Sequence, residues 1–149
     1  MQSVQNLILW FPLIWNDRQW DDDYFLMMIR KKLERMELFY RSSKAHHLYA
    51  LSDAENIHKV VSVLDRILDH NYLEHAMQEN GWYEKYSEYD WEIKTKPTED
   101  PNYVEWVDTM TPEQNELFLK CGRDADNNEV NDFIFVFEFL RDHIREWWD

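Results

Sequence analysis

The sequence contains few of the residues that make tight turns, with two glycines and four prolines among 149 residues. An all-β sandwich or barrel needs a turn about every 8–12 residues, so this composition argues against both folds. A chain of this length can bury roughly two thirds of its unfolded surface in one core. We therefore predict a single, mainly α-helical domain over residues 1–149, arranged as a small bundle.

Cysteine and positive charge are also scarce. The one cysteine, Cys121, excludes an internal disulfide and is typical of a reducing cytoplasm. The 30 acidic and 16 basic side chains give a net charge of −14. Phosphate groups bind to surfaces rich in lysine and arginine. Because this chain is strongly acidic, we expect neither nucleic acid nor an anionic membrane as a direct partner. The charge favours a protein partner with a basic surface.

The N-terminal segment lacks the features of a targeting signal or a membrane span. Residues 7–15 are apolar, but no basic residues precede them, no small-residue cleavage site follows, and Pro12 interrupts the run. Because proline disrupts a helix, we predict an extended arm over residues 1–20. Its apolar side chains need cover, either from the domain's own core or from a second subunit, which would make the arm a homodimer contact.

Residues 21–80 are predicted to form an antiparallel helical hairpin. Three aspartates at 21–23 stand where a helix N-terminus favours negative charge, and one long helix follows as far as Tyr40. Apolar residues recur in it at helical spacing. The predicted stripe consists of Phe25, Met28, Ile29, Leu33, Met36 and Tyr40.

The second helix of this hairpin has a sequence signal at each end. Ser52 and Glu55 match a capping box, which predicts a helix start. The helix can continue to Asn80, with Gly81 as its terminator and a break at residues 69–71.

Residues 81–110 form an acidic aromatic segment. Tyr89, Trp91 and Ile93 alternate with polar residues at the period of a half-buried strand. Residues 97–101 would make a turn, and residues 104–107 would make a return strand. The segment is either a small β-hairpin or an irregular loop.

The C-terminal part, residues 111–149, is predicted to hold two helices. Thr111 and Gln114 match a second capping box, and the helix that follows should be short and end near Gly122. Residues 124–128 are polar and are predicted to form a linker. Apolar residues at helical spacing over 133–148 predict the final helix.

A calcium site is incomplete in this sequence. Asp124, Asp126 and Asn128 begin like a calcium-binding loop. The sixth position, which requires glycine, is Glu129, and the twelfth, which requires a bidentate glutamate, is Phe135. We therefore expect no calcium there.

Patterns for other metals and for nucleophilic catalysis are equally weak. His70, Glu74 and His75 lack the spacing of a zinc-binding motif. Cys121, beside Gly122, is placed near the end of the predicted short helix, where the helix dipole raises a thiol pKa. We predict no catalytic residue, no cofactor and no metal ion. A small hydrolase using carboxylates and His70 is the weakest of three functional hypotheses.

Acidity is concentrated in the second half of the chain. Residues 81–149 hold 18 acidic and 7 basic side chains, against 12 and 9 in residues 1–80. Aromatic rings surrounded by carboxylates are typical of a surface that meets arginine or lysine, although they can equally be core rings beside solvated acids. The predicted partner-binding residues are Trp82, Tyr83, Glu84, Tyr86, Glu88, Tyr89, Asp90, Trp91, Glu92, Tyr103, Glu105, Trp106 and Asp108.

Two motifs resemble a group of small tailed-phage proteins of unassigned function. An Arg-x-Trp-Asp core at residues 18–21 follows an aromatic lead-in and precedes a long helix, and the chain closes on Trp-Trp-Asp at residues 147–149. The resemblance covers about residues 12–72 and 133–149 and implies a viral protein acting in a bacterial cytoplasm.

With the net charge and the acidic aromatic segment, this resemblance leads to our main hypothesis. We expect a non-enzymatic accessory protein that binds and inhibits a host protein, such as a nucleic-acid-handling defence enzyme of the CRISPR effector type. The alternative is a virion or assembly component.

Overall fold

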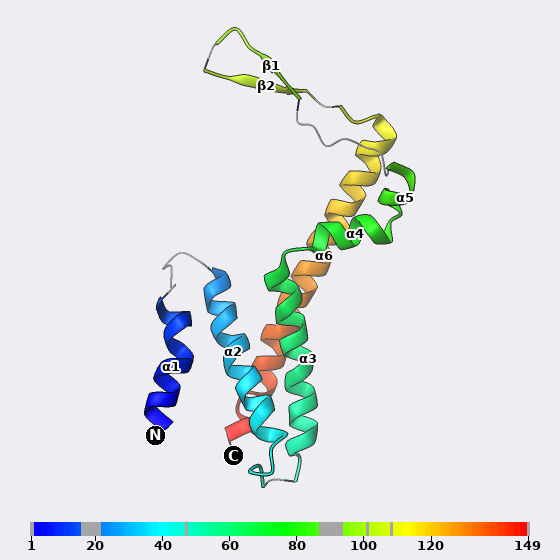
Figure 1. The fold of residues 1–149 in the computed structure, drawn as a ribbon. Helices are drawn as coiled ribbons and strands as arrows, with labels where there is room; N and C mark the ends of the chain where they lie inside the picture. The colour runs from blue at the N-terminus through cyan, green and yellow to red at the C-terminus, as the bar shows by residue number, and fades with distance from the viewer. Residues whose placement is uncertain are drawn as a thin grey trace. The chain divides into compact units, whose positions relative to one another are not determined.

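The computed structural model describes residues 2–15, 22–46, 48–86, 94–100, 102–107 and 109–148. The mainly α-helical prediction is confirmed, together with one small antiparallel β-hairpin (Figure 1). The elements are α1 (Gln2–Trp15), α2 (Asp22–Tyr40), α3 (Ala50–Asp69), α4 (Tyr72–Glu79), α5 (Trp82–Tyr86), β1 (Lys94–Pro97), β2 (Val104–Val107), α6 (Pro112–His143) and the 3-10 turn η1 (Glu146–Trp148).

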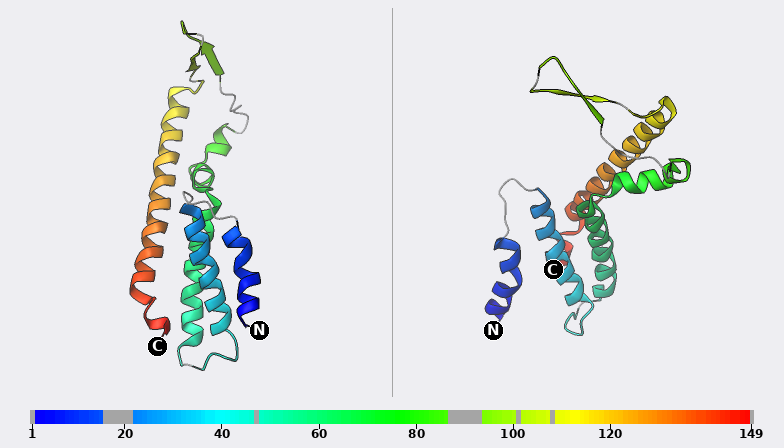
Figure 2. Two further views of the ribbon diagram at one scale, coloured as in Figure 1. Left: turned by 90° about the vertical axis from the view of Figure 1, so that its left-hand side faces the viewer. Right: turned by 45° about the horizontal axis from the view of Figure 1, so that its top comes forward.

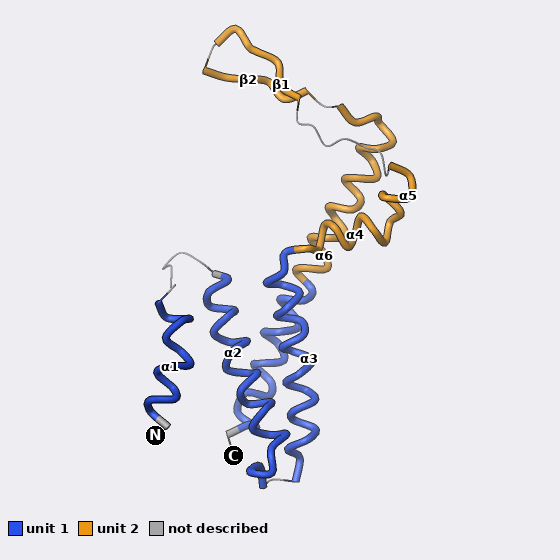
Figure 3. Tube along the Cα trace, in the orientation of Figure 1, with its two compact units in different colours: residues 1–70, 131–149 blue, residues 71–130 orange. Residues whose placement is uncertain are grey.

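Where the sequence predicts one domain, the contacts within the chain divide it into two compact units (Figure 3). Unit 1 consists of residues 1–70 and 131–149, and unit 2 consists of residues 71–130. Helix α6 contributes its first part to unit 2 and its last part to unit 1. Each unit has its own buried core.

The predicted helical hairpin forms the centre of unit 1, where α2 and α3 lie side by side in Figures 1 and 2. The inward face of α2 differs from the predicted stripe in its first turn, because Leu26 is buried while Phe25 is 53 % exposed and Met28 is only partly covered. The inward residues then recur at alternating intervals of three and four, the spacing at which a helix keeps one face on its neighbour. They are Leu26, Ile29, Leu33, Met36 and Tyr40.

Helix α3 begins two residues before the predicted capping box. The first helical residue is Ala50, so Ser52 lies inside the helix and makes no cap, and the N–H of Asp53 bonds the carbonyl of Tyr49 at 2.9 Å. Burial of Ala50 against the core explains the earlier start, since tertiary packing overrides a local cap. The predicted break is confirmed, because His70 ends α3 in the left-handed region at φ 52°.

The predicted extended arm is wrong, because residues 2–15 form helix α1 with Pro12 inside it. Proline removes only one hydrogen bond, the one that the N–H at position 12 would donate to the carbonyl of Ile8. Asn6, Trp10 and Leu13 are partly covered and share one helix face. Arg35 of α2 donates to the Asn6 side chain at 3.3 Å, which places this face against α2.

The two helices predicted after residue 111 are one continuous helix, α6. Its start is as predicted, since the Thr111 N–H bonds Gln114 Oε1 at 2.8 Å and the Gln114 N–H bonds Thr111 Oγ1 at 3.2 Å. The predicted stop at Gly122 and the linker at 124–128 are wrong. A glycine inside a helix costs only about 1 kcal/mol, and burial of Cys121 and Ala125 one turn apart offsets it.

Polar contacts hold the helices of unit 1 to one another at two places. Arg66 of α3 holds the carboxylate of Asp132 of α6 through two bonds of 2.8 and 3.0 Å. The buried hydroxyl of Tyr40 donates to the carbonyl of Trp147 at 2.6 Å, which fixes η1 against the end of α2. Trp147 is therefore packed into the core of unit 1.

Unit 2 is built around Trp82, whose side chain is completely buried. Its ring lies 4.9 Å from that of Tyr86 and 5.9 Å from that of Phe118, measured between centroids. The end of α4 is held to α6 because the side chain of Asn80 donates to Asp124 at 3.0 Å. The other buried members of this core are Ala76, Met77, Cys121 and Ala125.

Candidate functional site

The β-hairpin of unit 2 offers one apolar face and one charged face. The strands pair antiparallel, with Thr95 opposite Trp106 and Pro97 opposite Val104. Directly opposed residues point to the same side of a sheet, and alternate residues along a strand point to the same side as well. Thr95, Pro97, Val104 and Trp106 therefore share one side, which we call the apolar hairpin face.

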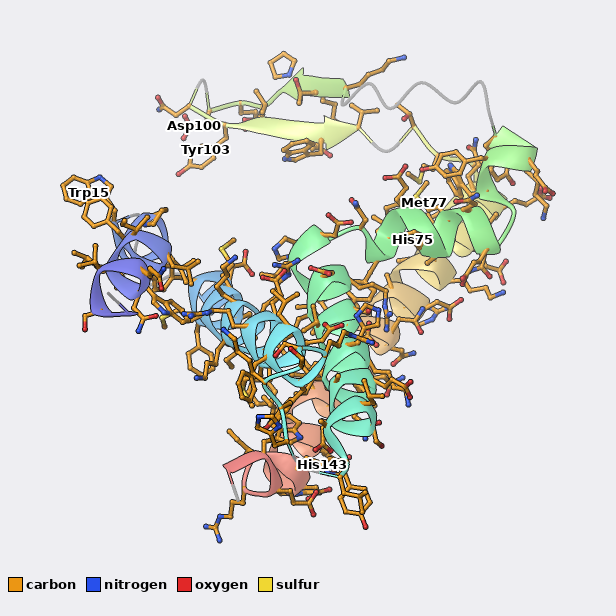
Figure 4. The ribbon with its side chains drawn as sticks, turned by 60° about the horizontal axis from the view of Figure 1, so that its bottom comes forward. Trp15, His75, Met77, Asp100, Tyr103 and His143 are labelled. Carbon is orange, nitrogen blue, oxygen red and sulfur yellow. The ribbon has the colours of Figure 1, made fainter. Side chains whose placement is uncertain are left out.

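The turn that joins the two strands is held by local hydrogen bonds. The side chain of Asp100 accepts from the backbone N–H of Asn102 at 2.9 Å, and the N–H of Tyr103 donates to the carbonyl of Asp100 at 3.0 Å. The Thr98 hydroxyl lies 3.0 Å from the carbonyl of Tyr103, across the turn. Asp100 and Tyr103 lie together at this end of the hairpin (Figure 4). The connection predicted at residues 97–101 lies between Pro97, which ends β1, and Val104, which begins β2, and Pro101 lies outside the described residues.

All eight strand residues are exposed, so the apolar hairpin face lies open. Trp106 is 68 % exposed and Val104 is 56 % exposed, and Tyr103 at the turn is 68 % exposed. An isolated two-stranded hairpin is marginally stable in water, and covering its apolar face would stabilise it. A large exposed tryptophan is also the residue type most enriched at the energetic centres of protein interfaces.

The charged face and the surrounding unit set the electrostatics of the site. On the charged face, Lys96 and Glu105 form an ion pair of 3.0 Å, and both side chains are 58 % exposed. Such an exposed pair contributes little to stability. Unit 2 as a whole holds 15 acidic and 5 basic side chains, a net charge of −10, against 15 and 11, or −4, in unit 1. The field around the hairpin therefore favours a cationic partner.

The structure separates the predicted partner-binding residues into different environments. Trp82 is fully buried, so its assignment to a binding surface is wrong, and Tyr86 is half-buried against it. Tyr83 and Glu84 are exposed on the short helix α5. Tyr103, Glu105 and Trp106 lie exposed on the hairpin. Outside the described residues lie Glu88, Tyr89, Asp90, Trp91, Glu92 and Asp108.

The sequence reasoning missed the residues that complete the apolar hairpin face. Thr95 and Pro97 join Val104 and Trp106 only because the turn sets the register of the two strands. The alternation of Val104, Glu105 and Trp106 was the available signal for a strand with one apolar side. The partner strand alternates lysine with Thr95 and Pro97, and this signal is weaker because neither residue is strongly apolar.

The described residues do not assemble a centre with the features of a metal or nucleophile site. Within the ranges that the structure covers, no group of three or more His, Cys, Asp or Glu side chains could hold a metal ion. The Nε2 of His70 lies 2.8 Å from a carboxylate oxygen of Asp23. Asp124 and Asp126 lie inside α6, so they cannot form a calcium loop.

Cys121 lies inside α6 and far from its C-terminal end at His143. Burial raises the pKa of its thiol above the ordinary value of 9.0, and the nearby carboxylate of Asp124 adds to the shift. The predicted direction of this shift was right, but its cause is desolvation and not the helix dipole. A buried thiol of raised pKa is a poor nucleophile.

Unit 1 contains a hollow between α1 and α2. This hollow measures about 400 Å³, within the size range of ligand pockets. Its lining includes the cations Lys32 and Arg35, and no carboxylate or thiol is among its described lining residues. The lining offers no acid–base pair of titratable groups. The remaining lining residues are Asn6, Trp10, Met36, Phe39, Tyr40 and Trp147.

Among the described residues, no helix is both long enough and apolar enough to cross a membrane. Comparison with known protein families, with curated proteins and with solved structures found no match for this chain.

Proposed function

We propose that this chain is a non-enzymatic phage accessory protein that binds and inhibits a bacterial host protein through its β-hairpin. The observation that carries the proposal is the apolar hairpin face, with Trp106 and Val104 open to solvent. This face belongs to a unit of net charge −10. An apolar anchor within an acidic surface suits a partner that offers an apolar pocket with arginine or lysine at its rim.

The phage origin and the host target rest on other support. The motifs at residues 18–21 and 147–149 resemble small tailed-phage proteins, and such proteins act in the cytoplasm of the host cell. Enzymes that handle nucleic acids carry basic surfaces, which an acidic protein can occupy. We therefore propose a defence enzyme of the CRISPR effector type as the partner class.

We also propose that the chain self-associates through its N-terminal segment, by a surface in unit 1. The alternative function, a virion or assembly component, is favoured by the same exposed apolar segment, because structural proteins need such contacts. Mass spectrometry of purified particles distinguishes the two functions. An accessory inhibitor should be absent from virions, and a stoichiometric amount in the particle would support the alternative.

The host-binding proposal is tested by capture with two matched variants. Tagged wild-type protein is used at low salt to recover partners from host lysate, beside Trp106→Ala and Trp15→Ala. Both tryptophans are exposed, at 68 % and 74 %, but Trp15 belongs to α1. A specific partner should be recovered by wild type and Trp15→Ala and lost with Trp106→Ala.

The partner, once identified, is purified and its affinity is measured by calorimetry. Loss of a central tryptophan typically removes 2 kcal/mol or more of binding free energy, so Trp106→Ala should weaken binding by about 30-fold. Because the partner is expected to be basic, raising the salt concentration should weaken binding as well. Recovery of no partner at low salt, or equal affinity of wild type and Trp106→Ala, would refute the proposal.

A further inference from the structure

Helix α1 has an apolar face that points away from the rest of unit 1. Six large apolar side chains on this face are between 50 % and 74 % exposed. They are Val4, Leu7, Ile8, Phe11, Ile14 and Trp15. The ring of Trp15 projects from the end of the helix into open space in Figure 4. We call this set the outer face of α1.

The outer face is separate from the face that holds α1 on α2. The covered residues Asn6, Trp10 and Leu13 lie about 140° around the helix axis from the centre of the outer face, at 3.6 residues per turn. Contact with α2 therefore leaves the outer face free. A helix with two apolar faces is expected where each face meets a different neighbour.

The area of the outer face is close to what one side of a stable dimer needs. Large side chains have full areas of roughly 150–250 Å², so the exposed fractions leave about 700 Å² of apolar surface. A specific protein interface buries about 800 Å² on each partner. The largest apolar patch on an ordinary monomer is about 300–600 Å², so this face is large for a surface that remains in water.

The absence of charge in α1 favours a second copy of this chain over a membrane surface as the partner of the outer face. The 14 residues of α1 contain no Asp, Glu, Lys or Arg, although the chain has a net charge of −14. Two copies of this acidic chain repel one another electrostatically, and the repulsion is weakest where two uncharged surfaces meet. A membrane-surface helix would instead carry lysine or arginine beside its apolar face, which α1 lacks.

The intervals between the apolar residues of the outer face are the same in both chain directions, as an antiparallel pair of identical helices requires. Val4, Ile8, Phe11 and Trp15 follow one another at intervals of four, three and four residues, which read the same in both directions. An antiparallel pair about a two-fold axis therefore places Ile8 against Phe11 of the second copy and Val4 against Trp15. The smallest side chain of the row meets the largest, as close packing requires.

We infer that the outer face of α1 pairs antiparallel with the same face of a second copy of this chain, forming a two-fold dimer. The inference deepens the self-association proposed above, since it names the face and the orientation, and it is independent of the hairpin. In the dimer, Phe11 and Ile8 lie at the centre of the interface, and Leu7 and Ile14 flank the row. The Phe11 and Trp15 rings already lie 5.1 Å apart, so the centre and one end form a continuous surface.

The first experiment measures the mass of the full chain by sedimentation between about 1 and 100 μM. We expect a dimer for wild type, and a monomer for the double variant Leu7→Glu/Ile8→Glu, which places two charges in the interface. The control is Leu51→Glu, because Leu51 on α3 is 66 % exposed, as is Leu7. Far-UV circular dichroism should give the same helix content for all three proteins.

A monomeric wild type over this range would overturn self-association itself. A dimer that persists in Leu7→Glu/Ile8→Glu, or that is lost equally in Leu51→Glu, would leave self-association standing and overturn the assignment to the outer face. Flotation with neutral phosphatidylcholine vesicles provides a third readout. Binding of monomers to vesicles, abolished by the double variant, would assign this face to a lipid surface and overturn the dimer.

The second experiment tests the orientation by disulfide crosslinking. Val4→Cys and Trp15→Cys are separately oxidised and then mixed and oxidised again. In the antiparallel pair, residue 4 of one copy lies about 16 Å along the helix axis from residue 4 of the other, too far for a bridge when either variant is oxidised alone. The antiparallel pair predicts a crosslink only in the mixture, and crosslinks in the separate samples would overturn it. Cys121 is fully buried and does not compete.

Discussion

Replacing Trp82 and replacing Trp106 should have opposite consequences, although both tryptophans belong to one acidic aromatic segment. Trp82 is fully buried between the rings of Tyr86 and Phe118. Removing a fully buried ring of about 200 Å² at 25 cal/mol per Å² costs about 5 kcal/mol, and large-to-small changes at buried tryptophans measure about 3–5 kcal/mol. Trp82→Ala should therefore lower the free energy of unfolding by about 3–5 kcal/mol.

Trp106→Ala should change the free energy of unfolding by less than about 1 kcal/mol, because two thirds of its side chain already lies in water. Urea unfolding followed by far-UV circular dichroism measures both changes, with the slope of the transition compared among the proteins. The reasoning would be refuted if Trp82→Ala lost less than about 1 kcal/mol, or if Trp106→Ala lost as much as Trp82→Ala. Loss of partner binding in Trp106→Ala at unchanged stability would then report on recognition and not on folding.

Three further predictions concern the backbone and the buried polar groups. Gly122→Ala should stabilise the protein by about 0.5–1 kcal/mol, because Gly122 lies inside α6 and an added Cβ meets no atom within 4 Å. Gly81→Ala should destabilise the protein, because Gly81 has φ 71°, which residues with a Cβ rarely adopt. Thermal unfolding measures both changes. Tyr40→Phe should cost about 1 kcal/mol and increase amide hydrogen exchange in the last turn of the chain, because the carbonyl of Trp147 loses its bond. Burial raises the pKa of the Cys121 thiol in the folded chain, so the unfolded chain releases this proton at a lower pH. The free energy of unfolding should therefore fall as pH rises past about 9. Cys121→Ala should reduce that fall.

Local signals in the sequence predict the elements that depend on local physics. The reciprocal cap at Thr111 and the break at His70 each satisfy backbone groups within a few residues, and Asp22 and Asp23 place negative charge in the first turn of α2. Those features are read from neighbouring side chains. The start of α3 is different, because burial of Ala50 by other helices decides it, and the sequence around Ser52 contains no trace of that burial.

The arm prediction failed because Pro12 was weighed alone. One missing hydrogen bond counts against a helix, but the side chains around it recur at helical spacing on two faces. An apolar run with almost no polar positions hides that periodicity, since each residue fits either a strand or a helix. Contact of Asn6 with Arg35 resolves the choice, and this contact joins residues 29 positions apart.

In the candidate site, too, local sequence does not determine which residues are buried. Aromatic residues beside carboxylates occur at Trp82 and at Trp106, and composition gives both the same prediction. Only the packing of α6 against α5 makes Trp82 a core residue, through Phe118, while the register of the hairpin leaves Trp106 open. Tertiary contacts thus divide one segment into scaffold and surface.

Residues 124–128 show why a polar run cannot be read as a linker on composition. Asp124 and Ala125 face the core of unit 2, where Asp124 accepts a bond from Asn80 and Ala125 is 5 % exposed. The next three residues are exposed, as they would be in a linker. Alanine between two aspartates keeps the buried stripe of the helix without raising the hydrophobicity of the run. Burial of Ala125, and of Cys121 one turn earlier, therefore favours a helix that continues through residues 124–128, and Ala125→Asp should destabilise α6 where Asp126→Ala should not.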